Sequence, residues 1–154
     1  MVFPRMVKVR QRFNRERIEN PAKELLRRIR ESGRLSRIKP GAQIAVTSGS
    51  RGIHGIADLT RAVIDELKHA GARPFIVPSM GSHGGGTAAG QIEVLESLGI
   101  TEASMSVPVM SSIETDMIGA TSAGTPVFMD RKARAADWVV VIHRIKLHTA
   151  FHGY

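Results

Sequence analysis

The chain has 154 residues, of which 42% are hydrophobic and 23% charged, values typical of one ordinary globular domain. It contains no cysteine, which excludes disulfide bonds, thiolate metal sites and cysteine nucleophiles. No apolar run reaches the roughly 18 residues of a membrane span, and the N-terminus lacks the apolar stretch of a secretory signal. These features predict a cytoplasmic protein without a membrane segment.

The formal net charge of +8 is concentrated near the N-terminus. Residues 1–40 hold 13 Lys and Arg against 4 Asp and Glu, whereas residues 41–154 hold 9 against 10. A basic arm can bind an anionic partner such as nucleic acid. No run of aromatic residues interleaves with these arginines to stack bases. We therefore favour a solvated helix face plus an edge strand, and expect no nucleic-acid partner.

In chain order, apolar and polar residues alternate with the period of a strand or of a helix, and Gly, Pro or Asp separate the segments. The predicted elements are a half-exposed strand at 7–13, a helix at 21–33, a buried strand at 43–47, a helix at 56–71, a strand at 74–78, a helix at 87–99, and strand-like runs at 106–110, 125–130 and 138–142.

This alternation predicts an α/β fold with a mostly parallel sheet and helices on both faces. We expect residues 1–40 to form a basic strand–helix segment packed on a domain made by residues 41–154. Ligands of such sheets bind beyond the carboxyl ends of the strands. Three polar loops follow predicted strands at that edge, at 48–52, 81–86 and 143–154, and their convergence predicts a site there.

The first loop lies in TSGSRGIHG (47–55), which offers small hydroxyls, free backbone N–H groups and the guanidinium of Arg51 ahead of a helix. This combination favours a carboxylate or phosphate, because Arg can bind either one bidentately. The loop is not a Walker A motif, since it lacks the Gly-Lys-Ser/Thr ending. The alternative is a surface loop whose arginine is solvated.

The second loop, GSHGGG (81–86), places His83 between glycines. An imidazole can give or take a proton near neutral pH, and glycine allows a ligand to approach the backbone closely. Gly84, Gly86 and Ala89 also match a dinucleotide fingerprint weakly, but the first glycine comes too late after the strand. A flexible turn with an incidental histidine is the remaining alternative.

The third loop, HRIKLHTAFHGY, contains His143, His148 and His152. The last two are four residues apart, a spacing that places both on one face of a helix, but no carboxylate in the segment completes a zinc set. We therefore expect no metal site within this chain. One of these histidines could pair with His83 across a substrate, so that two bases flank one carbon.

The segments VTSGSRGI, PFIVPSMGSHGGGTAAGQIEVLESLGIT and IHRIKLHTAFHG together resemble the N-terminal domain of the lactate racemase (LarA-like) superfamily, in its subgroup with the GSHGG loop. The resemblance covers residues 40–154. It implies a nickel-dependent racemase or epimerase of small 2-hydroxy acids. In that family a nickel-pincer nucleotide, tethered to a lysine between two α/β domains, accepts hydride from the substrate's C2 and returns it to the other face.

The resemblance also implies roles for individual residues. His83 and His148 match the two acid/base histidines, and Arg51 matches the arginine that binds the substrate carboxylate. Ser48 matches a substrate-binding position that is aspartate in lactate racemases. The glycines Gly84, Gly85 and Gly86 would let the flat cofactor approach the backbone.

Two departures bear on the substrate and the cofactor. Lactate racemases have aspartate where Ser48 stands and arginine where Gly84 stands, which puts lactate itself in doubt. The cofactor-tethering lysine is expected about ten residues past His148, and the sequence ends at Tyr154, before that position. We therefore expect a truncated first half that lacks its C-terminal domain, binds no cofactor tightly and is inactive alone. A nicotinamide-, nucleotide- or anion-binding domain without racemase activity is the alternative.

Overall fold

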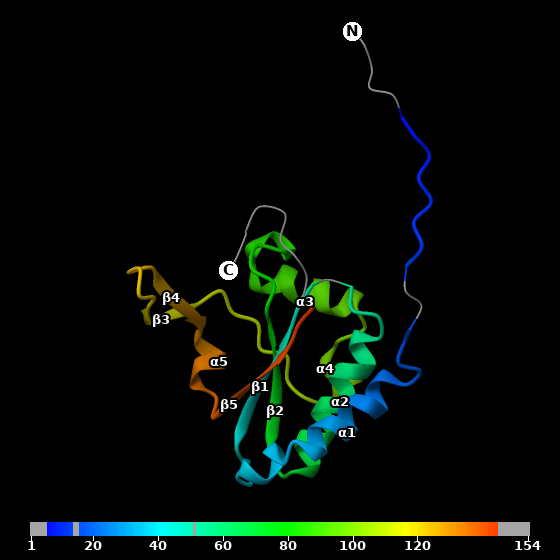
Figure 1. Cartoon of the computed structure of the whole chain (residues 1–154). Helices are drawn as coiled ribbons and strands as arrows, with labels where there is room; N and C mark the ends of the chain where they lie inside the picture. The colour runs from blue at the N-terminus through cyan, green and yellow to red at the C-terminus, as the bar shows by residue number, and fades with distance from the viewer. Residues whose placement is uncertain (1–5, 14–15, 51, 145–154) are drawn as a thin grey trace.

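A computed structural model of the chain describes residues 6–13, 16–50 and 52–144 (Figure 1). In order, its elements are α1 (Pro21–Glu31), η1 (Arg34–Arg37), β1 (Gln43–Ser48), α2 (Ile56–His69), β2 (Arg73–Pro78), η2 (Gly84–Gly86), α3 (Ala88–Ser97), α4 (Glu102–Met105), β3 (Thr115–Ala120), β4 (Pro126–Asp130), α5 (Arg131–Ala135) and β5 (Trp138–Ile142).

The central sheet has the strand order β2-β1-β5, and both strand pairs are parallel. Ser48, the last residue of β1, pairs with Pro78 on one side and Ile142 on the other, so the three strands end together. An isolated parallel bridge joins Val109 to Ile76, in the run that we predicted as a strand at 106–110. The parallel α/β fold is therefore confirmed.

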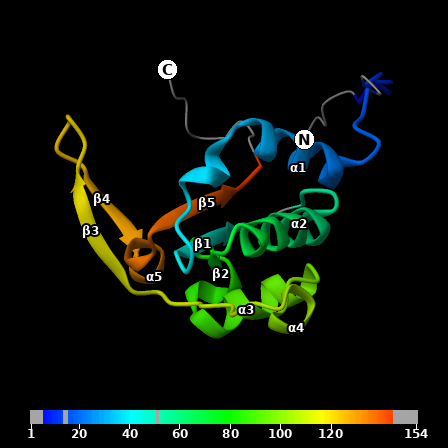
Figure 2. The same cartoon turned by 90° about the horizontal axis from the view of Figure 1, so that it is seen from below.

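The sheet separates two apolar clusters because strand side chains alternate between its faces. Ile44, Val46 and Ile76 pack with side chains of α2 and α3, and residues of α1 lie against this larger cluster. On the other face, residues of β1 and β2 form a smaller cluster with Ala133 of α5. Figure 2 shows α1 to α4 on one side of the sheet and α5 on the other. Helices on both faces were predicted.

Helix α1 begins where the sequence indicates, because Pro21 is suited to the first helical position and the Asn20 side chain accepts a hydrogen bond from a backbone N–H of the first turn. It packs against α2, where Arg30 makes two hydrogen bonds of 2.7 and 2.6 Å to Glu66. The Glu66 side chain is only 10% exposed, so this ion pair links the two helices at a position that is partly shielded from solvent.

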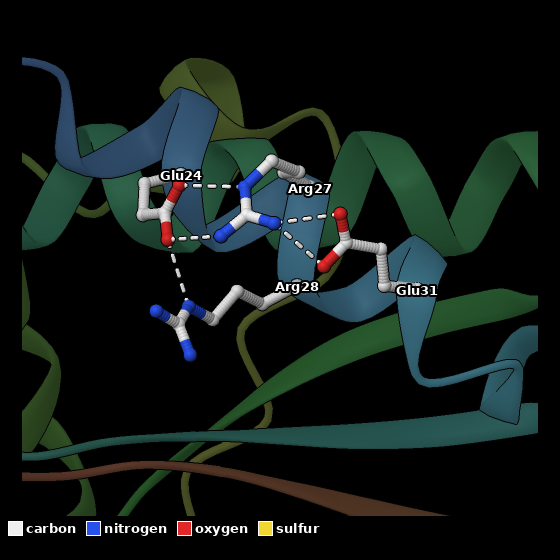
Figure 3. A network of polar contacts seen from close by, with 4 residues as sticks. All are labelled: Glu24, Arg27, Arg28 and Glu31. Atoms are coloured by element: carbon white, nitrogen blue, oxygen red, sulfur yellow. Dashed lines mark hydrogen bonds and ion pairs between the residues drawn. The ribbon is translucent and has the colours of Figure 1, made fainter.

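The outer face of α1 carries a network of charges, drawn in Figure 3. Glu24 accepts hydrogen bonds from Arg27 and Arg28, and Arg27 also reaches Glu31. The two arginines lower the pKa of Glu24 to about 2. These contacts show that much of the positive charge on this helix is balanced within it, as the prediction of a solvated helix face implies.

Residues 6–13 are a point where the structure differs from the sequence-based expectation of a strand. No strand forms there, and Val7, Val9 and Phe13 are 80%, 78% and 73% exposed. A strand requires a partner for its backbone hydrogen bonds. In the described part of the chain these residues have no adjacent sheet edge, so their alternation alone does not produce a strand.

The antiparallel hairpin of β3 and β4 was foreseen only in part, through the run at 125–130. Strand β3 has a weak sequence signal because Gly119 interrupts it and five of its six residues are exposed. The short helices α4 and α5 were also missed, since single turns have no measurable apolar period. Among the helices that the structure describes, none is long and apolar enough to cross a bilayer.

Candidate functional site

The loops that follow β1 and β2 are joined at the carboxyl edge of the sheet. The backbone N–H of Ser79 donates to the carbonyl oxygen of Ser48 at 2.8 Å. Beyond this link, the hydroxyl of Ser50 is hydrogen-bonded to Nδ1 of His83. The parallel topology predicts that these two loops lie side by side. The contact between Ser50 and His83 adds a hydroxyl–imidazole pair to this edge of the sheet.

The segment after β5 reaches the same edge. A Cβ built on Gly49 would lie 3.2 Å from Nδ1 of His143, so a larger residue at position 49 would press on that imidazole. Arg144 donates a hydrogen bond of 3.3 Å to the carbonyl oxygen of Gly52. The described parts of all three predicted loops therefore meet, and they bring His143 beside Gly49 and His83 beside Ser50.

The glycine-rich loop that carries His83 is anchored to α3. Gln91, a buried residue of α3, donates its side-chain amide to the carbonyl oxygen of Gly81 at 2.9 Å. Thr87 caps α3 by accepting from the N–H of Gly90, and its hydroxyl donates to the carbonyl oxygen of Gly84. These contacts give His83 a defined backbone position despite its glycine neighbours.

Gly84, Gly85 and Gly86 all have φ between 66° and 67°, the left-handed region that favours glycine. Their surroundings differ. A Cβ on Gly84 would lie 2.6 Å from the backbone nitrogen of Gln91 and closer still to the carbonyl group of Gly90. A Cβ on Gly85 or Gly86 would meet nothing within 4 Å. Glycine is therefore required at position 84 by close packing against α3, whereas Gly85 and Gly86 have free space around them.

Ser48 lies at the end of β1 on the same face as the buried side chains of Ile44 and Val46, and it is 0% exposed. Its hydroxyl is one of two buried side-chain oxygens that have no hydrogen-bond partner among the described residues, the other being that of Thr60. In this conformation Ser48 is not open to a ligand. Its role in substrate binding remains a prediction.

Two predicted site residues, Arg51 and His148, lie outside the described residues, and so does His152. Ser50 and His143 are the members of the site that sequence reasoning did not select. The hydroxyls of TSGSRGIHG were noticed as a group, but no pattern distinguished Ser50 from its neighbours. His143 could not be separated from the other histidines of its segment.

In the described ranges no group of three or more His, Cys, Asp or Glu side chains is placed to hold a metal ion. A cavity of about 250 Å³ lies between η1, α2 and the sheet, with Ile44, Leu35 and Trp138 among its lining. Because Ile44 and Trp138 pair near the amino ends of their strands, this cavity is remote from His83. The loops at the carboxyl edge are therefore the candidate site.

The comparisons with known proteins bear on this site. A search of curated proteins and a search of solved structures each found no match. The family model described as the lactate racemase N-terminal domain matches residues 10–154 and thus includes all three loops. The resemblance inferred from the sequence motifs is confirmed, and the chain belongs to the lactate racemase N-terminal domain family.

Proposed function

We propose that this chain is the substrate-side domain of a nickel-dependent racemase or epimerase that acts on small 2-hydroxy acids by hydride transfer. Family membership supports the reaction class. The observation that carries the proposal is the position of His83, a half-buried histidine at the carboxyl edge of the sheet. Its Nδ1 is hydrogen-bonded to the hydroxyl of Ser50. This leaves Nε2 as the ring atom that can exchange a proton with a substrate hydroxyl.

Full-length members of the family use a nickel-pincer nucleotide, which supplies the hydride acceptor when it is bound. The backbone at Gly85 and Gly86 is open to close approach by a flat ring, because a Cβ there would meet no described atom within 4 Å apart from those of the adjoining residues. The described residues supply no set of nickel ligands. In this proposal the chain therefore contributes substrate binding and proton transfer, and the metal is held by residues other than those described.

In the proposed reaction His83 accepts the proton of the substrate hydroxyl at Nε2 as C2 loses hydride, and it gives the proton back when the keto acid is reduced. His148 would do the same from the opposite face. Arg51 would bind the substrate carboxylate with its guanidinium, a geometry that fixes the orientation of C2. A C-terminal partner domain would complete the site, as family membership suggests.

The test is an assay of the protein expressed from its intact gene and supplied with nickel and the pincer nucleotide. Single enantiomers of small 2-hydroxy acids are incubated with it, and chiral chromatography follows the appearance of the mirror image. We expect conversion of at least one acid. His83→Ala should reduce it by roughly 10²-fold, the usual effect of losing an acid/base group. His69→Ala, on the exposed side of α2, is the matched control and should leave the rate unchanged.

Calorimetry with NAD and with the same acids separates the proposal from the nucleotide-binding alternative. Weak or absent NAD binding together with binding of a 2-hydroxy acid is the expected result. Tight NAD binding without any hydroxy-acid binding would replace the racemase by a nicotinamide-binding domain.

A further inference from the structure

The hydrogen bond between Ser50 and His83 joins two loops that are 33 residues apart in sequence. Both residues are half-buried, so the contact is partly shielded from water. The carboxyl ends of β1 and β2 bring the loops together through the bond from Ser79 to Ser48, which fixes the base of the contact. The position of the Ser50 hydroxyl against the imidazole thus follows from the fold.

We infer that Ser50 is a positioning residue, whose hydroxyl holds the His83 ring in one orientation and one neutral tautomer. In that tautomer Nδ1 carries the proton and donates a hydrogen bond to Oγ of Ser50, which leaves the lone pair of Nε2 free. The consequence for catalysis rests on the proposed function, because the free Nε2 is the atom that would accept the substrate's hydroxyl proton.

A hydroxyl partner has a specific advantage at this position. The bond from Nδ1–H to Oγ is the same in neutral imidazole with a free Nε2 and in imidazolium, so a proton can enter and leave Nε2 while the contact to Ser50 persists. Without that partner, a neutral histidine in water favours the tautomer protonated at Nε2, which cannot accept a proton there. A hydroxyl can accept from Nδ1–H or donate to an unprotonated Nδ1. In this proposal Ser50 is the acceptor, and it keeps His83 in the form that acts as a base.

A serine beside a histidine can instead be a nucleophile that the histidine activates. Such pairs have a third group that orients the base, usually a carboxylate on the other ring nitrogen. Among the described residues, no hydrogen bond or ion pair is made by Nε2 of His83. The geometry favours positioning over nucleophilic catalysis, and covalent labelling distinguishes the two.

The direct test reads the tautomer by nitrogen-15 NMR of the 154-residue chain labelled at histidine, at about pH 8.5, where an ordinary imidazole is neutral. We expect the wild-type His83 to be protonated at Nδ1. Ser50→Ala should move it toward the form protonated at Nε2, and Ser50→Thr should restore the wild-type spectrum. Ser82→Ala is the matched control, since Ser82 is the exposed hydroxyl next to His83 in the same loop. A spectrum of His83 that is the same in Ser50→Ala as in the wild type would overturn the inference.

Activity supplies a second readout in the protein expressed from its intact gene. Ser50→Ala should lower kcat about tenfold, the scale of one hydrogen bond, with KM little changed. Ser50→Thr should recover most of the loss. A changed tautomer in Ser50→Ala with no racemase activity in the wild type would leave the inference standing and reject the proposed function. Labelling of Ser50 by a fluorophosphonate probe would reject positioning in favour of a nucleophile.

Discussion

Replacing Gly84 and Gly85 by alanine, one at a time, tests how the loop around His83 is built. Both residues have a left-handed backbone, with φ of 66° and 67°, so each alanine incurs a cost of about 1–2 kcal/mol from that conformation alone. Only at Gly84 does the new Cβ collide with the main chain of α3. Main-chain atoms cannot rotate away, which adds about 1–3 kcal/mol of overpacking. We expect Gly84→Ala to lower the free energy of unfolding by that additional amount relative to Gly85→Ala.

Urea unfolding followed by circular dichroism measures both values, with Gly85→Ala serving as the matched control. Gly90→Ala tests the same contact from the opposite side. Alanine in a helix interior is ordinarily more stable than glycine by about 0.5–1 kcal/mol. Here its Cβ would overlap the carbonyl group of Gly84, so we expect a loss of stability. Equal losses in Gly84→Ala and Gly85→Ala, or a gain in Gly90→Ala, would refute the packing that the structure shows.

Three further predictions concern the site and the ion pair between α1 and α2. In the protein expressed from its intact gene, His148→Ala should lower turnover by roughly 10²-fold, as for His83; a near-normal rate on the true substrate would reject its assignment. Arg51→Ala should raise KM more than it lowers kcat, whereas equal losses in kcat and kcat/KM would mean that it acts in the transition state only. Hydrogen bonds from Arg30 lower the pKa of Glu66 from its usual 4.5, so the stability that this pair contributes is present above about pH 4.5 and lost as pH falls through the lowered pKa. Arg30→Met should lower the free energy of unfolding at pH 7 and flatten its loss at acid pH, as measured by urea unfolding; an unchanged pH profile would contradict the linkage.

The central part of the fold was predictable because each signal there is local and agrees with the tertiary structure. Residues 43–48 and 138–142 are short apolar runs followed by polar loops, which is the pattern of buried parallel strands. Residues 7–13 show why pattern alone is insufficient. They alternate as a strand should, but pairing depends on a partner edge that no local pattern reveals.

The sequence predicted which loops form the site, but not all of the residues that make contact within it. His83 was identifiable because it is the single titratable group among glycines at a strand end, and the parallel topology places its loop beside the loop that follows β1. Ser50 was not identifiable, because its importance comes from a contact across the sheet edge with a residue distant in sequence. The close packing of Gly84 against α3 was not identifiable either, since a glycine that packs against a helix and a glycine that a ligand approaches have the same sequence pattern. The role of Gly84 in cofactor binding remains a prediction.

The measurement that tests the account most directly is racemisation in deuterium oxide by the protein expressed from its intact gene and supplied with nickel and the pincer nucleotide. A single enantiomer of a small 2-hydroxy acid is converted, and mass spectrometry reads the isotope at C2 of the product. Hydride transfer, with His83 handling only the hydroxyl proton, predicts a product that keeps its original hydrogen at C2. Incorporation of deuterium at C2 would show that a base removes that hydrogen as a proton, and would contradict the proposed mechanism.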